Sequence, residues 1–180
     1  MIITIDGVAG AGKTTLAQHM SDEYRDRFSV NVVHMDDLYE GWDDPLGAAL
    51  TTKLELIVSA HRTEQPFTTT QFDWERLLPG SSFTIEPREL LILEGVGSGQ
   101  SAIREFVETK IWIDLEPIVG LRRVLARDGR EIEAQMIEFL EAQRNHFMKE
   151  GTRDAADFHL NGLNSPLRFK RVRSLRRSYR

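Results

Sequence analysis

The chain has 180 residues, no cysteine and a formal net charge of −5. This length suits one domain with a sizeable core, and the lack of cysteine excludes disulfides and cysteine-based metal sites. No apolar run reaches the ~20 residues that a membrane-spanning helix needs, and no signal-peptide pattern opens the chain. We therefore expect a soluble cytoplasmic protein that does not bind a membrane.

The charge is distributed unevenly along the chain. Residues 168–180 hold seven Lys or Arg residues and no acid, so the rest of the chain is strongly acidic. An acidic body argues against general nucleic-acid binding. We expect residues 166–180 to form a basic tail, either solvated or in contact with RNA, an acidic partner or the acidic body itself.

A phosphate-binding loop is predicted at the start of the chain. Residues 2–5 indicate a short buried strand, and a helix-forming run begins at Leu16. Between them the sequence matches the pattern Gly-x-x-x-x-Gly-Lys-Thr. The residues expected to hold ATP are Gly7, Ala9, Gly10, Ala11, Gly12, Lys13, Thr14 and Thr15.

Each part of this loop has a chemical role. Glycines let successive backbone N–H groups point at an anion, and the following helix adds the positive end of its dipole. Lys13 would reach the β- and γ-phosphates, and the Thr14 hydroxyl would bind Mg²⁺. ATP and Mg²⁺ are therefore the expected cofactors.

Predicted strands and helices alternate through the rest of the chain. The expected strands are 2–5, 30–34, 89–95, 110–115 and 158–161, and the expected helices are 16–27, 46–60, 102–107, 117–127 and 131–149. Residues 68–78 are expected to be a strand or an extended loop, with a short edge strand at 83–85. The alternation predicts an α/β, three-layer P-loop NTPase fold: a five-stranded parallel sheet flanked by helices, in one domain over 1–165.

Two acidic positions follow predicted strands, at the sheet edge where ligands of such folds bind. A kinase acting on a hydroxyl needs a carboxylate to orient the hydroxyl and accept its proton, so Asp36 is a candidate general base; the alternative is a helix cap. Glu94 ends an apolar strand, where an acid commonly holds Mg²⁺ directly or through water; the alternative is a cap on the next turn. Tyr39 and Trp42 offer rings for an acceptor to stack on, or they simply pack.

Arginines are concentrated near residues 122–130. Arg123 and Arg127 are four residues apart, so on a helix they share a face, and two like charges there need an anion. A transferring phosphoryl group is such an anion, so we expect a lid around residues 122–135. The alternative is a salt-bridged surface helix, because Glu131 and Glu133 are close in sequence.

At this point the sequence resembles uridine kinases and their relatives, phosphoribulokinase and bacterial pantothenate kinase. Residues 32–39 are similar to the segment that ends in Asp-x-Phe-Tyr, residues 93–95 to the apolar-Glu-Gly segment, and residues 123–128 to the lid sequence Arg-x-x-x-Arg-Asp. Uridine-kinase-like proteins of actinobacteria share four segments with this chain, at 36–42, 73–74, 93–97 and 126–129.

The resemblance implies roles for individual residues. Asp36 would be the general base. Thr14, Asp36 and Glu94 would be the metal-side residues, which lie next to Mg²⁺. Lys13, Arg123 and Arg127 would stabilise the phosphates. Tyr39 would touch the acceptor, and one of Asp43, Asp44 or Asp73 would hold sugar hydroxyls. An insertion that carries further acceptor-binding residues in uridine kinases is shorter here.

We therefore expect an ATP-dependent kinase that phosphorylates a small-molecule hydroxyl, most simply that of a pyrimidine nucleoside such as uridine. Two alternatives stay open: a kinase of the same fold for a nucleotide, a pantothenate-like alcohol or a sugar, and a nucleotide-dependent switch or ATPase with no acceptor. The guanine-reading motif Asn-Lys-x-Asp of GTPases is absent from the sequence. A homo-oligomer is compatible with the composition.

Overall fold

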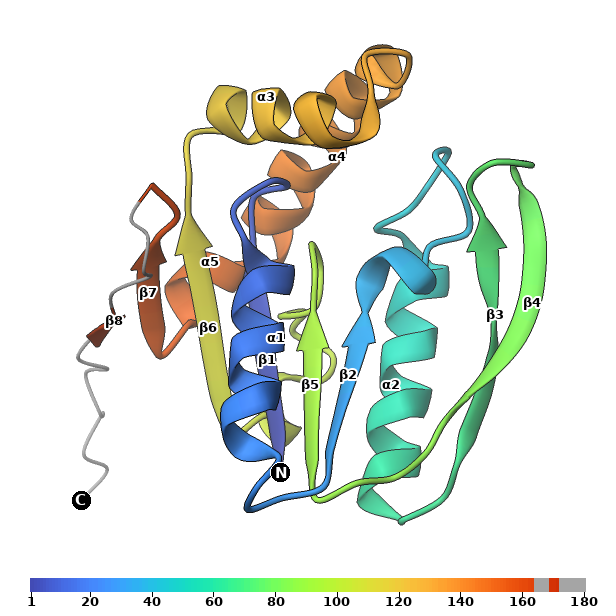
Figure 1. The fold of residues 1–180 in the computed structure, drawn as a ribbon, viewed down its shortest axis with the longest axis vertical. Helices are drawn as coiled ribbons and strands as arrows, with labels where there is room; N and C mark the ends of the chain where they lie inside the picture. The colour runs from blue at the N-terminus through green and yellow to red at the C-terminus, as the bar shows by residue number, and fades with distance from the viewer. Residues whose placement is uncertain (164–168, 172–180) are drawn as a thin grey trace.

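The computed structural model describes residues 1–163 and 169–171, and its centre is a six-stranded sheet (Figure 1). Five parallel strands lie in the order β2-β5-β1-β6-β7. They are β1 (Ile2–Gly7), β2 (Val30–His34), β5 (Leu90–Glu94), β6 (Thr109–Asp114) and β7 (Phe158–Asn161). The expected five-stranded parallel sheet is confirmed.

One further strand joins the sheet from the predicted basic tail. Strand β8 (Phe169–Arg171) pairs antiparallel with β7, which the sequence did not predict. The other residues of the expected tail, 166–168 and 172–180, lie outside the described part of the chain.

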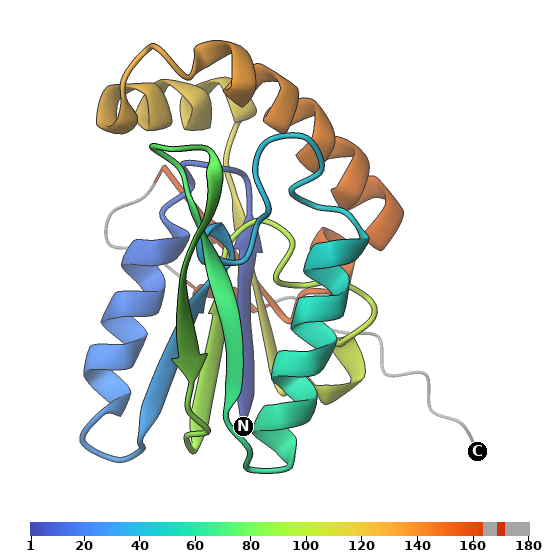
Figure 2. The ribbon, with the colours of Figure 1, turned by 90° about the vertical axis from the view of Figure 1, so that its right-hand side faces the viewer.

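Helices cover both faces of the sheet and its carboxyl end. In Figure 2, α1 (Lys13–Tyr24) lies on one side of the sheet and α2 (Ala48–Arg62) on the other. Helix α3 (Pro117–Asp128) lies above the carboxyl ends of the strands, and α4 (Glu133–Glu150) descends from there on the side of α2 to the short α5 (Thr152–Ala155). The expected helix at 102–107 is wrong in extent, because only a 3-10 turn, η2 (Arg104–Phe106), forms there.

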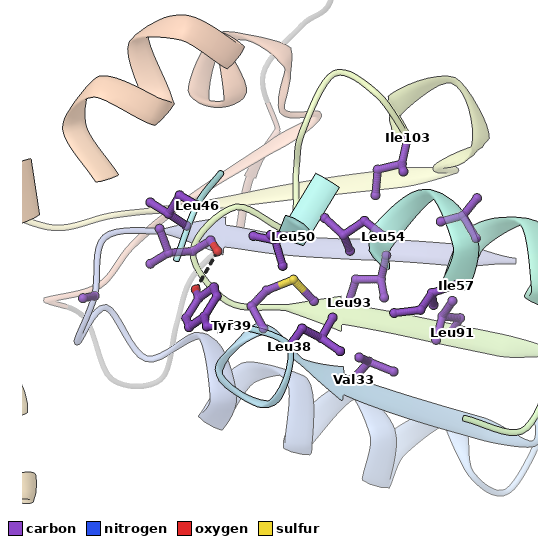
Figure 3. Packing of buried hydrophobic residues seen from close by; sticks show 14 of the residues in the cluster. Val33, Leu38, Tyr39, Leu46, Leu50, Leu54, Ile57, Leu91, Leu93 and Ile103 are labelled. Atoms are coloured by element: carbon purple, nitrogen blue, oxygen red, sulfur yellow. Dashed lines mark hydrogen bonds between the residues drawn. The ribbon is translucent and has the colours of Figure 1, made fainter. Parts of the chain in front are cut away.

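The core consists of one layer on each face of the sheet. Alternate side chains of a strand point to opposite faces, so Ile3, Ile5 and Ile92 pack under α1 while Leu91 and Leu93 face α2. Figure 3 shows the α2 side, where Leu50, Leu54 and Ile57 pack on Leu91 and Leu93. Burial on both faces explains why the strands read as continuous apolar runs.

A separate hairpin stands beside α2 (Figure 1). It consists of β3 (Phe67–Asp73) and β4 (Leu78–Ile85), paired antiparallel, at the two segments where the sequence suggested extended structure. Two hydrogen bonds join it to the 3-10 turn η1 (Met35–Asp37) after β2. Gln71 Nε2 donates to Asp37 Oδ1 at 2.6 Å, and Trp74 Nε1 donates to the backbone oxygen of Asp36 at 3.3 Å. The hairpin tip is thereby held at the carboxyl end of the sheet.

Candidate active site

A cavity of about 740 Å³ opens at this end of the sheet. Its walls come from the loop between β1 and α1, from η1, from the hairpin tip and from α3 and α4. Twelve of the predicted site residues line it: Ala9, Gly10, Gly12, Lys13, Thr14, Thr15, Asp36, Tyr39, Trp42, Glu94, Arg123 and Arg127. The structure therefore brings the predicted ATP-binding residues and the predicted general base into one cavity.

The P-loop owes its shape to close backbone packing. Gly10 and Gly12 both have positive φ, 77° and 95°, which favours glycine. At Gly10 a Cβ would clash with the backbone oxygen of Gly120 in α3, whereas at Gly12 nothing lies within 4 Å. Ala9 N donates to Gln143 Oε1 of α4 at 3.1 Å. The loop is thus supported from outside, and the face at Gly12 stays open for phosphates.

Lys13 is buried inside the loop that it follows. Its Nζ donates to the backbone oxygens of Gly7 and Val8, each at 2.9 Å. Burial lowers the pKa of Lys13, and the carboxylates of Asp6 and Glu94 oppose that shift. The ammonium group is therefore held at the loop in the position from which a P-loop lysine meets phosphates.

Asp6 supports the candidate site from below the P-loop, and it was not predicted from the sequence. Its carboxylate accepts hydrogen bonds from the backbone N–H groups of Gly7 at 2.7 Å, Gly97 at 3.1 Å and Gly99 at 2.9 Å. Burial raises the pKa of Asp6 to about 6, although these bonds and Lys13 lower it. Asp6 thus ties the P-loop to the loop after β5, and the available signal was a carboxylate directly after the apolar run 2–5.

The metal-side residues meet at the ends of β2 and β5. Thr14 Oγ1 donates to Glu94 Oε1 at 3.0 Å, and the same oxygen accepts a hydrogen bond from His34 Nδ1. This bond raises the pKa of His34, against the effect of partial burial. Hydroxyl and carboxylate oxygens are the ligands that Mg²⁺ prefers, and it commonly takes one or two carboxylates together with substrate phosphates. The donor set of Thr14, Glu94 and Asp36 fits that requirement.

An all-protein metal cage is not part of this site. Within residues 1–163 and 169–171, no group of three or more His, Asp or Glu side chains is arranged to enclose a metal ion.

Asp36 faces the cavity from η1. Its side chain is accessible to water there, yet the surrounding walls displace much of the solvent. This partial desolvation raises the pKa of Asp36; Lys13 opposes the shift, while Glu94 and Asp37 add to it. A carboxylate whose pKa is raised accepts a proton more readily than an ordinary aspartate, as a general base requires.

The two arginines of the predicted lid have different partners in this structure. Arg123 Nη1 donates to the backbone oxygens of Gly10 at 3.2 Å and Gly162 at 3.0 Å, so it joins α3 to the P-loop and to the end of β7. Arg127 forms a two-point pair with Asp128, with both N···O distances 2.6 Å. Both arginines are among the residues that line the cavity. The pair with Asp128 engages Nε and Nη2 of Arg127, so a phosphate could displace Asp128 from these atoms or bind at the remaining N–H donors.

An aromatic wall, formed by Tyr39, Trp42, Trp74 and Phe139, lines part of the cavity. Trp42 and Trp74 meet with ring centroids 5.0 Å apart, and Trp42 also packs edge-on against Phe139 at 6.4 Å. Tyr39 contributes its ring, but its hydroxyl donates to the backbone oxygen of Val96 at 2.7 Å. Trp74 and Phe139 were not predicted for this wall, and their only signal was the Asp-Trp pair at 73–74.

Five predicted site residues are not on the cavity lining: Gly7, Ala11, Asp43, Asp44 and Asp73. Asp73 Oδ1 accepts the backbone N–H groups of Glu75 at 3.1 Å and Arg76 at 2.9 Å, so it stabilises the hairpin turn. The backbone oxygen of Asp44 accepts the N–H of Gly47 at 3.2 Å, just before α2. In this structure the sugar-binding acid therefore remains a prediction without a counterpart among the cavity residues.

Comparison with known proteins agrees with the kinase class that the geometry of the cavity indicates. A uridine kinase of Halobacterium salinarum is 26% identical over 160 residues, covering 77% of this chain and 68% of the relative. A cytidylate kinase of Methanococcoides burtonii is 26% identical over 159 residues, covering 88% and 81%. The solved structure of a possible uridine kinase from Bacillus stearothermophilus superimposes with a TM-score of 0.65 at 22% identity, covering 88% and 87%.

These likenesses support membership of the uridine kinase-like family of P-loop kinases. Phosphoribulokinase from Rhodobacter spheroides shares the fold, with a TM-score of 0.62 at 12% identity over 89% of this chain and 69% of that one. No family model matches the chain. The expected fold and the expected enzyme class, a P-loop small-molecule kinase, are confirmed. No helix among the described residues is long and apolar enough to cross a membrane.

Proposed function

We propose that this uridine kinase-like enzyme transfers the γ-phosphoryl group of ATP to the 5′-hydroxyl of a pyrimidine nucleoside such as uridine, in the cytoplasm. The observation that carries the proposal is the position of Asp36. Its carboxylate shares one cavity with Lys13 and Thr14 of the P-loop and with the aromatic wall. A switch or simple ATPase has no need for such a carboxylate in one cavity with an aromatic wall.

The charges of the cavity favour a neutral acceptor over a nucleotide. Its lining holds three cationic side chains, Lys13, Arg123 and Arg127, and all three are needed for the phosphates of ATP. The other charged lining residues are acids: Asp36, Asp37, Glu75, Glu94, Asp128 and Glu131. A nucleoside monophosphate would bring its own phosphate among these acids, with no further cation of the lining left to meet it. A nucleoside brings a flat ring for the tryptophans and hydroxyls for the carboxylates.

The proposed transfer is an in-line displacement. Asp36 accepts the proton of the acceptor hydroxyl while the new oxygen–phosphorus bond forms and the bond to the β-phosphate oxygen breaks. Lys13 and the lid arginines stabilise the negative charge on the transferring group. Mg²⁺, held by Thr14 with Glu94 and Asp36 nearby, would neutralise phosphate charge when bound. Closure of the proposed lid around residues 122–135 would exclude water from the cavity, so that the nucleoside rather than water is the acceptor.

The test combines an acceptor screen with one variant. Phosphoryl transfer from ATP is measured with uridine, cytidine, cytidine monophosphate, pantothenate and a hexose. Asp36→Asn should lower kcat about 10²–10⁴-fold, the range of general-base catalysis, while binding of a non-hydrolysable ATP analogue is retained. Asp26→Asn, which changes an exposed carboxylate outside the cavity lining, is the matched control. Unchanged turnover in Asp36→Asn would contradict the base assignment, and hydrolysis of ATP at one rate with or without every acceptor would favour an ATPase.

A further inference from the structure

His34 occupies a position that the reaction described above does not use. It is the last residue of β2, and the sheet register places it directly beside Glu94, the last residue of β5. Its Nδ1 donates a hydrogen bond to Oε1 of Glu94, the same oxygen that accepts the Thr14 hydroxyl. The Glu94 side chain is only 5% exposed, whereas that of His34 is 40% exposed. One buried carboxylate oxygen is therefore held from two elements at once.

The hydrogen bonds from Thr14 and His34 to Glu94 differ in whether they depend on the metal ion. Thr14 Oγ1 is itself an expected Mg²⁺ ligand, so its bond to Glu94 follows the position of the metal. His34 belongs to a neighbouring strand, and its position is fixed by the parallel pairing of β2 with β5. A glutamate has several rotatable bonds, and an anchor that does not depend on the metal limits them before the metal arrives.

We propose that His34 is a positioning residue of the metal site, which fixes the carboxylate of Glu94 toward Thr14 so that Mg²⁺ binds with the nucleotide. This inference rests on the proposed function, because it takes Glu94 to be a metal-side residue. Partners in the outer shell of metal sites orient the ligands in this way, and their loss typically lowers metal affinity by about 10–100-fold. His34 therefore contributes to metal affinity through Glu94 without touching nucleotide or acceptor.

The experiment measures metal binding apart from catalysis. Mn²⁺ replaces Mg²⁺ as a probe, and its free concentration is followed by electron paramagnetic resonance in the presence of a non-hydrolysable ATP analogue. His34→Ala should raise the dissociation constant of Mn²⁺ by roughly 10-fold or more. His34→Asn should stay close to wild type, because the Asn amide nitrogen stands where Nδ1 stood and can donate the same bond. His19→Ala, on the exposed face of α1, is the control that should leave the constant unchanged.

A kinetic readout separates positioning from general damage. In His34→Ala the Mg²⁺ concentration for half-maximal activity should rise by the same factor, while kcat at saturating Mg²⁺ and the affinity for the metal-free nucleotide stay near the wild-type values. His34→Leu, which keeps most of the side-chain volume without a donor, replaces His34→Ala if the latter loses its cooperative thermal transition.

The outcomes are distinct. Unchanged or tighter Mn²⁺ binding in His34→Ala overturns the inference, and so does His34→Asn binding as weakly as His34→Ala. If the wild-type protein binds no Mn²⁺ with the nucleotide analogue, the assignment of the metal side in the proposed function is wrong instead. A wild-type protein that binds Mn²⁺ tightly but phosphorylates no acceptor leaves the role of His34 supported and refutes the proposed reaction alone.

Discussion

Replacing Tyr39 with Phe removes one hydroxyl whose role the structure defines. The ring is 3% exposed, and the hydroxyl donates to the backbone oxygen of Val96 at 2.7 Å (Figure 3). Without that donor the Val96 oxygen stays buried and unpaired, which costs about 1–3 kcal/mol of unfolding free energy. A loss of about 2 kcal/mol corresponds to a fall in Tm of roughly 4–8 °C for a protein of this size. Catalysis should change little, because the hydroxyl points to the backbone.

The assay pairs urea denaturation and calorimetry with steady-state kinetics. We expect Tyr39→Phe to lower the unfolding free energy as estimated above, with the KM for the acceptor within about 2-fold of wild type. Tyr24→Phe is the matched control, because within residues 1–163 the Tyr24 hydroxyl makes no hydrogen bond and its ring only packs against Phe28. A Tyr39→Phe protein of wild-type stability whose acceptor KM rises 10-fold would refute this reasoning and place the hydroxyl on the acceptor.

Two further predictions concern the P-loop. In urea denaturation of the nucleotide-free protein, Gly10→Ala should lose more unfolding free energy than Gly12→Ala. Both positions have positive φ, which costs an alanine about 1–3 kcal/mol, but only Gly10→Ala adds a clash with Gly120. Equal losses would argue against the close packing of Gly10 and Gly120. The pKa of Asp6 is about 6 in the folded protein, above the ordinary value of 3.8 that applies to the unfolded chain. Between pH 3.8 and about 6 the native state therefore binds more protons than the unfolded state, and the unfolding free energy should fall as the pH rises through this range. Asp6→Asn should be less stable throughout but lose this fall, and an unchanged pH dependence would contradict the burial of the charge.

The parallel sheet was predictable because each of its strands carries its own signal. β1 and β5 are buried on both faces, so their sequences are continuous apolar runs between turn residues. The hairpin was not resolved in the same way, since most of β4 is exposed and contains Pro79 and Gly80, residues that read as a turn. Its pairing depends on contacts with β3, which no local pattern encodes. The start of α1 at Lys13 was also missed, because the first helical turn is part of the phosphate loop.

The residues of the candidate site likewise fall into those that the sequence could place and those that it could not. Lys13, Thr14, Asp36 and Glu94 follow directly from strand ends, so a motif and a predicted sheet suffice to bring them together. Residues on long connections could not be placed from sequence. Asp73 serves the hairpin turn, and the aromatic wall needs Trp74 from the hairpin and Phe139 from α4, two elements with no sequence relation.

The cavity's charge balance explains why its parts must act together. Six carboxylates and three cations line it, so a polyphosphate is attracted only where the cations are concentrated and the carboxylates are paired. Lys13 is already there, buried between the loop oxygens, but Arg127 is held by Asp128 and the Glu94 oxygen is held by Thr14 and His34. Under the proposed function, a nucleotide that arrives with Mg²⁺ would supply a cation for Glu94 and Asp36 together with an anion for Arg127. A metal-free nucleotide would supply only the anion, so we expect the metal complex to bind more tightly than the nucleotide alone.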